Sequence, residues 1–230
     1  MATSFLIGKG TVVKIALLPI GSRVEPIAVP NIEVAADADA GTDSISLKTA
    51  LPENVLIPAG TSLKFRNPTT GDPFLSQLRQ DAKAGDASLA VFALGEKIVT
   101  DSTSTYPLKL AARTAANLGR SGNRQESVNF DSDGYSDGLT TSITQTLSLP
   151  GNWLPSDDGF ATAEYAFLEL REVYVWLTMP KIKQAATKGR TYHGPASINS
   201  IPIDDSADGI VTGNIEVTFN GRPNYDPDQF

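Results

Sequence analysis

Glycine and proline divide this sequence into short runs, and that division limits what the chain can form. The 230 residues include 19 glycines and 15 prolines, which separate segments rich in Val, Ile, Thr and Phe. The stretch TSITQTLSLP at 141–150 alternates strictly, with Ile143, Leu147 and Leu149 on one side and mainly Ser or Thr on the other. Such alternation predicts a strand with one buried face. Frequent turns between short strands indicate a mainly β protein, with one large domain or two smaller ones.

Two further strands are predicted in the second half of the chain. VYVWLTMP at 173–180 has the composition of a strand that its final proline ends. The segment 208–223 alternates over a long run, with Ile215, Val217 and Phe219 on one face. The last seven residues, NYDPDQF, show no periodicity, so a mobile tail is expected there.

One helix is predicted in the segment LPSDDGFATAEYAFLEL at 154–170. Ser156, Asp157 or Asp158 can cap its N-terminus, where an acidic side chain also suits the helix dipole. Apolar residues recur at helical spacing and predict one buried face made of Phe160, Ala163, Phe167 and Leu170. The expected fold is therefore a β-sandwich or barrel with a single packed α-helix.

The first half contains an internal repeat with a constant offset of 44 residues. DADAGTDSISL at 37–47 aligns with DAKAGDASLAV at 81–91, and Asp, Ala, Gly and Ser recur at matching positions. Each copy has the pattern of a turn followed by an alternating strand, and IPAGTSLKF at 57–65 has that pattern again. Chance similarity between two turn-and-strand segments is the alternative interpretation.

The repeat divides the chain into three predicted parts. We expect an N-terminal strand and arm at 1–29, a small inserted β module at 30–103, and a larger β domain at 104–230 that ends in the C-terminal tail. Two copies are too few for a solenoid, which needs three or more stacked units.

Composition excludes several classes of protein. Hydrophobic residues make up 40% of the chain, enough for a packed core. The chain has no cysteine, which excludes disulfides, thiolate metal sites and cysteine nucleophiles, and fits a reducing cytoplasm. MATSFLIGKG at the N-terminus lacks the pattern of a signal peptide, and no run approaches the ~18 apolar residues of a membrane helix. A soluble protein without a membrane partner is expected.

The chain is acidic, and the acidity is concentrated in its second half. The formal net charge of −7 divides into −2 for residues 1–104 (9 basic, 11 acidic) and −5 for residues 105–230 (10 basic, 15 acidic). Affinity for nucleic acid comes mostly from lysine and arginine, so this chain is expected to repel DNA.

No arrangement of residues predicts an enzyme. The single histidine, His193 in RTYHGPAS, is the only candidate base for a nucleophilic triad, and its glycine and proline neighbours indicate a turn residue. The chain has no phosphate-binding loop and no serine elbow motif. The carboxylates of Asp157/Asp158 and of Asp204/Asp205 are adjacent in sequence, so the members of each pair do not face each other. We expect no catalytic, cofactor-binding or metal-binding residues.

The segment FDSDGYSDGL at 130–139 raises the question of a calcium loop. An EF-hand needs glycine at its sixth position and glutamate at its twelfth, and Ser136 and Ser142 stand there. A looser calcium site on the aspartates at 131, 133 and 137 stays open. The two Asp-Gly pairs favour a turn between strands, because glycine supplies positive φ and aspartate closes local hydrogen bonds.

The order of motifs in the second half resembles the major tail tube proteins of long-tailed bacteriophages. In sequence these motifs are LSLPGNW, PSDDG, FATAEYAFLEL, VYVWLTMP, YHGPASINSI and DGIVTGNIEVTFNG. The resemblance covers residues from about 105 to 230 and extends to KGTVVKIALL near the N-terminus. The sequence pattern of the 30–103 module is similar to that of small β modules in other phage structural proteins.

The resemblance implies a virion structural protein that assembles in the host cytoplasm and has no enzyme activity or cofactor. It implies hexameric rings stacked into a tail tube through which the genome passes into the bacterial host. The implied partners are further copies of the chain, the tape measure, the tail terminator, the baseplate or tail tip, and a sheath where the tail has one.

Two alternatives and one surface assignment stay open at this point. A phage decoration protein or carbohydrate-binding β module is the first alternative, and a hydrolase that uses scattered carboxylates is the second. Acidic side chains such as Glu126 and Glu216 are candidates for an acidic lumen that lets DNA pass without binding it, although charges on the outer face fit them equally.

Overall fold

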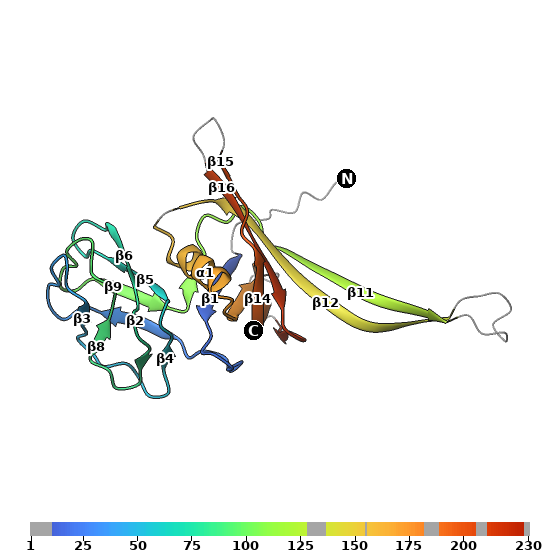
Figure 1. Cartoon of the computed structure of the whole chain (residues 1–230), viewed down its shortest axis with the longest axis horizontal. Helices are drawn as coiled ribbons and strands as arrows, with labels where there is room; N and C mark the ends of the chain where they lie inside the picture. The colour runs from blue at the N-terminus through green and yellow to red at the C-terminus, as the bar shows by residue number, and fades with distance from the viewer. Residues whose placement is uncertain (1–10, 128–136, 155, 182–188, 206–210, 228–230) are drawn as a thin grey trace.

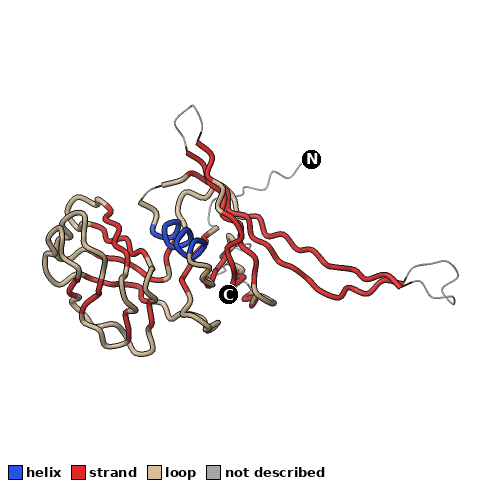
Figure 2. Tube along the Cα trace, in the orientation of Figure 1, coloured by secondary structure: helices blue, strands red, loops and turns tan. Residues whose placement is uncertain are grey.

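The computed structural model describes residues 11–127, 137–154, 156–181, 189–205 and 211–227. Helix α1 (Asp158–Leu168) lies between two groups of strands (Figure 1). A large sheet with a long projecting hairpin lies on one side of the helix, and smaller sheets from residues 29–106 lie on the other (Figures 1 and 2). The prediction of a mainly β protein with one packed helix is confirmed.

Among the described residues, the large sheet has nine strands and every pair in it is antiparallel. In sequence order these are β1 (Val12–Leu17), β10 (Leu108–Lys109), β11 (Asn117–Ser127), β12 (Asp137–Asn152), β13 (Val173–Thr178), β14 (Thr191–Ser200), β15 (Ile203–Asp205), β16 (Val211–Phe219) and β17 (Asn224–Asp226). Seven of them follow the order β10-β1-β13-β14-β16-β12-β11, while β15 pairs with β16 and β17 with β14.

Side-chain alternation places one face of this sheet in the core. β16 buries Ile215, Val217 and Phe219 at 5% exposure or less, as the sequence predicts. β12 continues this face with Leu147 opposite Val217 and Leu149 opposite Ile215. Burying such apolar surface contributes roughly 1.5–3 kcal/mol per large side chain, which makes this face the main stabilising surface of the sheet.

Ile143 corrects the prediction for the same strand. Its side chain is 67% exposed, although alternation places it on the face of the two buried leucines. The reason is the length of β12, which pairs with β16 only between residues 146 and 152 and continues beyond the core with β11 as its partner.

Helix α1 begins at the cap that its sequence predicts. The Asp157 side chain accepts hydrogen bonds from the backbone N–H groups of Gly159 and Phe160, at 3.1 and 3.4 Å. The buried side of the helix includes Phe160 and Ala163, and it packs against β1, β10 and β14 of the large sheet and against β5 of the smaller sheets. The helix thus joins the two groups of strands.

Leu170 was expected on this buried side and is instead 91% exposed. The helix ends two residues earlier, and the Arg171 N–H donates to the Ala166 carbonyl at 2.8 Å to close the last turn. Leu170 has a φ of +52° in that turn, which takes it out of helical spacing and into solvent. Phe167, also predicted on the buried side, is only half-buried.

The C-terminal segment corrects another prediction. Residues 224–226 form β17, where a mobile tail was expected, and residues 228–230 lie outside the described part of the chain. β17 pairs with β14 with Tyr225 opposite Tyr192, and the two rings lie 5.1 Å apart. A three-residue strand is too short to show periodicity, so alternation could not predict it.

Residues 29–106 form a four-stranded sheet, β2-β9-β5-β6, and two two-stranded sheets, β3-β8 and β4-β7. The strands are β2 (Val29–Glu33), β3 (Ser44–Ser46), β4 (Leu56–Ile57), β5 (Ser62–Arg66), β6 (Pro73–Gln77), β7 (Ala82–Lys83), β8 (Ser88–Ala90) and β9 (Thr103–Tyr106). Their inward side chains, which include Ile45, Leu63, Phe65 and Leu89, are fully buried.

The two copies of the repeat pair with each other and make matching contacts. β3 and β8 are antiparallel partners, with Ile45 opposite Leu89. An isolated bridge between Val34 and Leu47 recurs 44 residues later between Leu78 and Val91. The repeat in the sequence therefore corresponds to a repeated local structure.

The turns explain why the same residues recur in both copies of the repeat. The Asp37 carboxylate accepts a hydrogen bond from the Thr100 N–H at 2.8 Å, and the Asp81 carboxylate accepts one from the Ala59 N–H at 2.8 Å. The repeated glycines at 41 and 85 have φ values of +87° and +85°, a region that glycine enters without strain. Each aspartate ties its copy of the turn to a neighbouring loop.

A close approach of backbone and side chain fixes this part of the chain to α1. Gly60 has a φ of +89°, and a Cβ at this position would lie 2.0 Å from Tyr165 Cε1. Beside it, the Ser62 N–H donates to Thr162 Oγ1 at 2.9 Å. The contact requires glycine, because any other side chain would displace the helix tyrosine.

Candidate functional site

His193 lies within β14 and not in a turn, which corrects the interpretation drawn from its neighbours. Gly194 and Pro195 fall where β14 exchanges one neighbouring strand, β17, for another, β16. A proline has no N–H for a continuous ladder, and a change of partner strand is a position that tolerates it. The histidine side chain is 10% exposed.

The contacts of His193 are those of a structural side chain. Its Nδ1 lies 2.9 Å from the Tyr174 hydroxyl and 3.6 Å from Glu25, and its Nε2 lies 3.4 Å from Asp226. Trp176 Nε1 donates to the same Glu25 carboxylate at 2.8 Å. Burial, with a smaller effect of Glu25, raises the pKa of Tyr174 to about 12. These contacts join Glu25 and β17 to strands β13 and β14. None of the described side chains that contact His193 is a serine or cysteine, so they do not form a nucleophilic triad.

The adjacent aspartates 157 and 158 form the helix cap and not an acid–base couple. Asp157 Oδ2 accepts a third hydrogen bond, from the Ala111 N–H at 3.0 Å, which ties the start of α1 to the chain after β10. Burial raises the pKa of Asp157 and raises that of Asp158 to about 6, while Lys64 opposes both shifts. Asp158 Oδ1 accepts a hydrogen bond from the adjacent Gly159 N–H, at 3.1 Å.

The other acidic candidates do not converge on a site in the described part of the chain. Asp204 is exposed on β15, with Asp205 next to it in the strand. Asp131 and Asp133 of the possible calcium loop lie outside the described residues, and Asp137 begins β12. Among the described residues, no three His, Asp or Glu side chains are placed to hold a metal ion, and no helix is long and apolar enough to cross a membrane.

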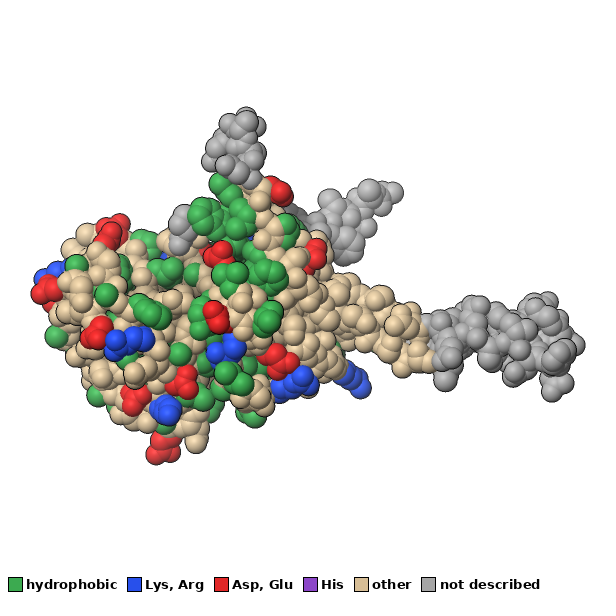
Figure 3. All heavy atoms as spheres, viewed as in Figure 1, with side chains coloured by type: hydrophobic (Ala, Val, Ile, Leu, Met, Phe, Trp, Pro, Cys, Tyr) green, Lys and Arg blue, Asp and Glu red, His purple; other side chains and the backbone are tan. Residues whose placement is uncertain are grey.

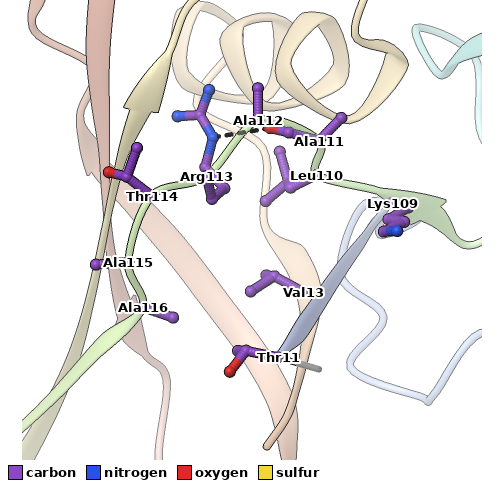
Figure 4. A pocket seen from close by; sticks show the side chains of 10 residues that line it. All are labelled: Thr11, Val13, Lys109, Leu110, Ala111, Ala112, Arg113, Thr114, Ala115 and Ala116. Carbon is purple, nitrogen blue, oxygen red and sulfur yellow. Dashed lines mark hydrogen bonds between the residues drawn. The ribbon is translucent and has the colours of Figure 1, made fainter. Parts of the chain in front are cut away.

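A groove between β1 and the segment after β10 is lined mainly by small and apolar side chains (Figure 4). Arg113 points away from this lining (Figure 4), and its guanidinium donates to the carbonyls of Ala111, Leu149, Asn152 and Gly213 at 2.7–3.3 Å. Burial lowers the pKa of Arg113. Its hydrogen bonds join β12, β16 and the 111–113 segment, which is a structural role.

The face of the large sheet opposite α1 carries a network of short polar side chains. Ser148 donates to Asn214 at 3.0 Å, and Glu216 accepts from Asn214 at 3.3 Å and from Ser200 at 3.0 Å. Asn199 donates to Thr218 at 2.6 Å further along the same face. β12, β14 and β16 contain no lysine or arginine. We call this surface the polar face.

A hairpin formed by β11 and β12 projects from one edge of the sheet, away from the rest of the molecule (Figures 1 and 2). From Asn117 to Asn123 and from Thr141 to Thr146, most side chains on both of its faces are exposed. Figure 3 shows the described part of the hairpin as a thin extension without a covering layer. An isolated two-stranded hairpin is only marginally stable in water, so this one needs a neighbouring surface.

The sequence predicted only half of this hairpin. Alternation at 141–149 indicates β12, whereas β11 has the sequence NLGRSGNRQES, which lacks apolar alternation. The two Asp-Gly pairs predicted a turn between two strands, and the antiparallel pairing of β11 with β12 agrees with that prediction. The sequence analysis did not predict how far the first of these strands extends.

The large sheet, which is backed by α1, thus carries a polar face and an uncovered hairpin. The chain matches the phage tail tube protein family over residues 97–225, which is more than half of its length. It belongs to that family. The family is one of structural components of the virion tail and not of enzymes, which confirms the predicted resemblance, the tail location and the absence of an enzymatic role.

Two solved structures are similar to the chain at low identity. One comes from the tail of an empty gene transfer agent (GTA) particle with C6 symmetry, at 16% identity and a TM-score of 0.44, and covers 51% of this chain and 84% of the other. The second comes from the virion of a native GTA particle, at 16% identity and a TM-score of 0.43, with 51% and 86% covered. No curated protein matches the chain.

Proposed function

We propose that this tail tube protein self-assembles into six-membered rings that stack into a hollow tube, and that the phage genome passes through this tube into the bacterial host. The observation that carries the proposal is the uncovered β11–β12 hairpin. Its backbone hydrogen bonds form only one ladder, and its exposed polar side chains cannot build a core. Copies of the same chain supply the missing surface when the subunits assemble.

The polar face is the surface that we assign to the lumen. Its serine, threonine and asparagine side chains bind one another, and its strands present Glu216 without any lysine or arginine. Salt-dependent affinity for DNA needs cationic side chains that release counterions, and this face has none in its three central strands. A neutral to acidic lining lets a polyanion slide without binding it.

The small β module at 30–103 belongs on the outside of the tube in this arrangement. It lies on the other side of α1 from the large sheet, so it leaves the polar face uncovered (Figure 1). Beyond further copies of the chain, the proposed partners are the tape measure, the tail terminator, the baseplate or tail tip, and a sheath where the tail has one.

Negative-stain electron microscopy across a concentration series tests the proposal. We expect rings or hollow tubes of constant diameter. The matched variant replaces residues 123–142 with Asn-Gly, which closes the hairpin next to the Gly122–Ile143 pair with a favoured two-residue turn. This variant keeps the whole core, so its Tm is expected to stay close to that of the natural chain while its tubes are lost.

Two results would contradict the proposal. One is a natural chain that stays as small uniform particles at every concentration, including with tail tip proteins added as initiators. The other is a shortened variant that assembles normally. Binding to capsids or glycans without tube formation would favour the alternative of a decoration or carbohydrate-binding module.

A further inference from the structure

A groove lies at the root of the hairpin, on the side of the sheet that carries α1. It is lined by Arg120, Ile143, Gln145, Tyr192, Arg222, Pro223 and Tyr225. Arg120 and Ile143 come from the hairpin strands, and the last three residues come from the segment at the start of β17. The groove therefore joins the hairpin to the C-terminal part of the chain.

The groove is positively charged and partly aromatic, in a chain whose net charge is −7. The Arg120 guanidinium lies 5.1 Å from the centre of the Tyr192 ring, which itself lies 5.1 Å from the Tyr225 ring. Arg222 is exposed beside them. Asp226 does not neutralise this charge, because strand alternation places it on the opposite face, 3.4 Å from His193 Nε2.

The rim of the groove is exposed. Ile143 is 67% exposed and Tyr225 is 47% exposed there. A fitting partner has carboxylates for the two arginines and an apolar or aromatic side chain for the rim.

The chain itself contains a segment with this chemistry, NFDSDGYSDG at 129–138. It carries three aspartates, one phenylalanine and one tyrosine, and no basic residue. The segment connects the far ends of β11 and β12, at Ser127 and Asp137. Outside this part of the chain, the same combination occurs only at 156–166, the start of α1, where Asp157 and Asp158 are buried and cannot bind a second copy.

A copy cannot place this segment in its own groove. Arg120 lies seven residues before the end of β11, which corresponds to about 23 Å of strand. Nine residues lie between the two strands, and a chain of this length that is anchored at both ends cannot extend further than about half of its extended length, roughly 15 Å. The occupant must come from a second copy.

Building on the proposed tube, we propose that the 129–138 segment of one subunit binds in the groove at the hairpin root of a subunit in the next ring. The contact is head to tail, since the groove and the segment are different surfaces of one chain. Such contacts continue without closing and generate a polymer, which is what stacking requires. The interaction is electrostatic in part and weakens with salt.

The first test measures binding of a fluorescein-labelled NFDSDGYSDG peptide to the full-length chain by fluorescence anisotropy at low protein concentration. The control peptide, NFNSNGYSNG, replaces the aspartates with asparagine. We expect saturable binding that weakens at least tenfold for the control peptide and for the Arg222→Glu chain, because each change removes a charge-assisted hydrogen bond. Lys83→Glu, in the remote β7, is the charge-matched control and is expected to bind as the natural chain does.

A charge exchange makes the test specific. A peptide with lysine at the three aspartate positions is expected to bind the Arg222→Glu chain better than the natural one, and electron microscopy is expected to show rings without stacked tubes for Arg222→Glu. Equal binding of both peptides to the natural chain would overturn the inference, and so would normal tubes from Arg222→Glu. If the natural chain forms tubes but the peptides bind equally, or Arg222→Glu forms normal tubes, the proposed function stands and only the groove assignment fails. If the aspartate peptide binds specifically but the natural chain forms no tubes, the proposed function fails and the groove assignment stands.

Discussion

The carboxylate of Asp158 is expected to reduce the stability of the fold at neutral pH. It is 8% exposed in the first turn of α1, and burial raises its pKa to about 6 from an ordinary value of 3.8. A difference of about two pKa units corresponds to roughly 3 kcal/mol between the two protonation states. The favourable position of an acidic group at a helix N-terminus offsets up to ~1 kcal/mol of this cost.

Replacing Asp158 with asparagine keeps the acceptor for the Gly159 N–H and removes the buried charge. The folded state binds the Asp158 proton more tightly than the unfolded state does, so the natural chain loses stability as pH rises from about 4 to about 6. We therefore expect Asp158→Asn to raise the free energy of unfolding by ~2 kcal/mol at pH 7.5. Most of the gain is expected to be lost near pH 4, where the folded-state carboxyl is protonated and the unfolded-state carboxyl is roughly half protonated.

Urea denaturation followed by tryptophan fluorescence at pH 4 and pH 7.5 measures this difference. Asp204→Asn is the control, because Asp204 is exposed on β15 and its replacement is expected to change stability little at either pH. The reasoning is refuted if Asp158→Asn shifts stability equally at both pH values, or if it destabilises the chain at pH 7.5.

Three further predictions concern the replacement of individual side chains. Leu170→Gly is expected to stabilise the chain by about 1 kcal/mol in urea denaturation, because an exposed leucine occupies a left-handed position that glycine adopts without strain; a loss of stability would contradict this. Arg113→Ala is expected to cost about 3 kcal/mol by the same assay, and Arg113→Lys to restore little, because lysine cannot reach four carbonyls at once; a cost under ~1 kcal/mol would show that water replaces the guanidinium. Asp37→Ala and Asp81→Ala are both expected to lower the Tm in differential scanning calorimetry, because each removes the hydrogen bond that ties one copy of the turn to a neighbouring loop. Asp37→Ala is expected to have the somewhat larger effect, because it also removes the exposed ion pair with Lys97 at 2.7 Å; an unchanged Tm for both variants would contradict this.

The sequence predicts those elements whose side chains find their partners within the same chain and close to the core. Ile215, Val217 and Phe219 alternate because the sheet beneath them is continuous, and the structure buries all three. Asp157 caps α1 because its side chain needs only the N–H groups of the residues two and three positions later in the chain. Such patterns can be read from the sequence because the interactions that cause them are local or repeat at a regular spacing.

The failures come from positions where tertiary contacts decide the outcome. His193 has turn-forming neighbours, yet it lies in a strand because two different strands pair with β14 on either side of the Gly-Pro step. β17 exists because Tyr225 meets Tyr192, which lies 33 residues away in sequence. Leu170 continues the helical pattern, but the helix has already ended. A local pattern contains no information about any of these contacts.

The hairpin shows a second limit, which concerns assembly and not folding. Hydrophobic periodicity reports burial within one subunit, so a strand that only another copy covers, as we propose for β11, has no reason to alternate. β11 has the polar, glycine-containing sequence NLGRSGNRQES, yet it is as regular a strand as β12. In a subunit that works by self-association, the surfaces that matter most for function are polar, exposed and incomplete in the isolated chain. The exposed side chains at 117–123 and 141–146 are such positions, and in the proposed assembly a neighbouring copy covers them.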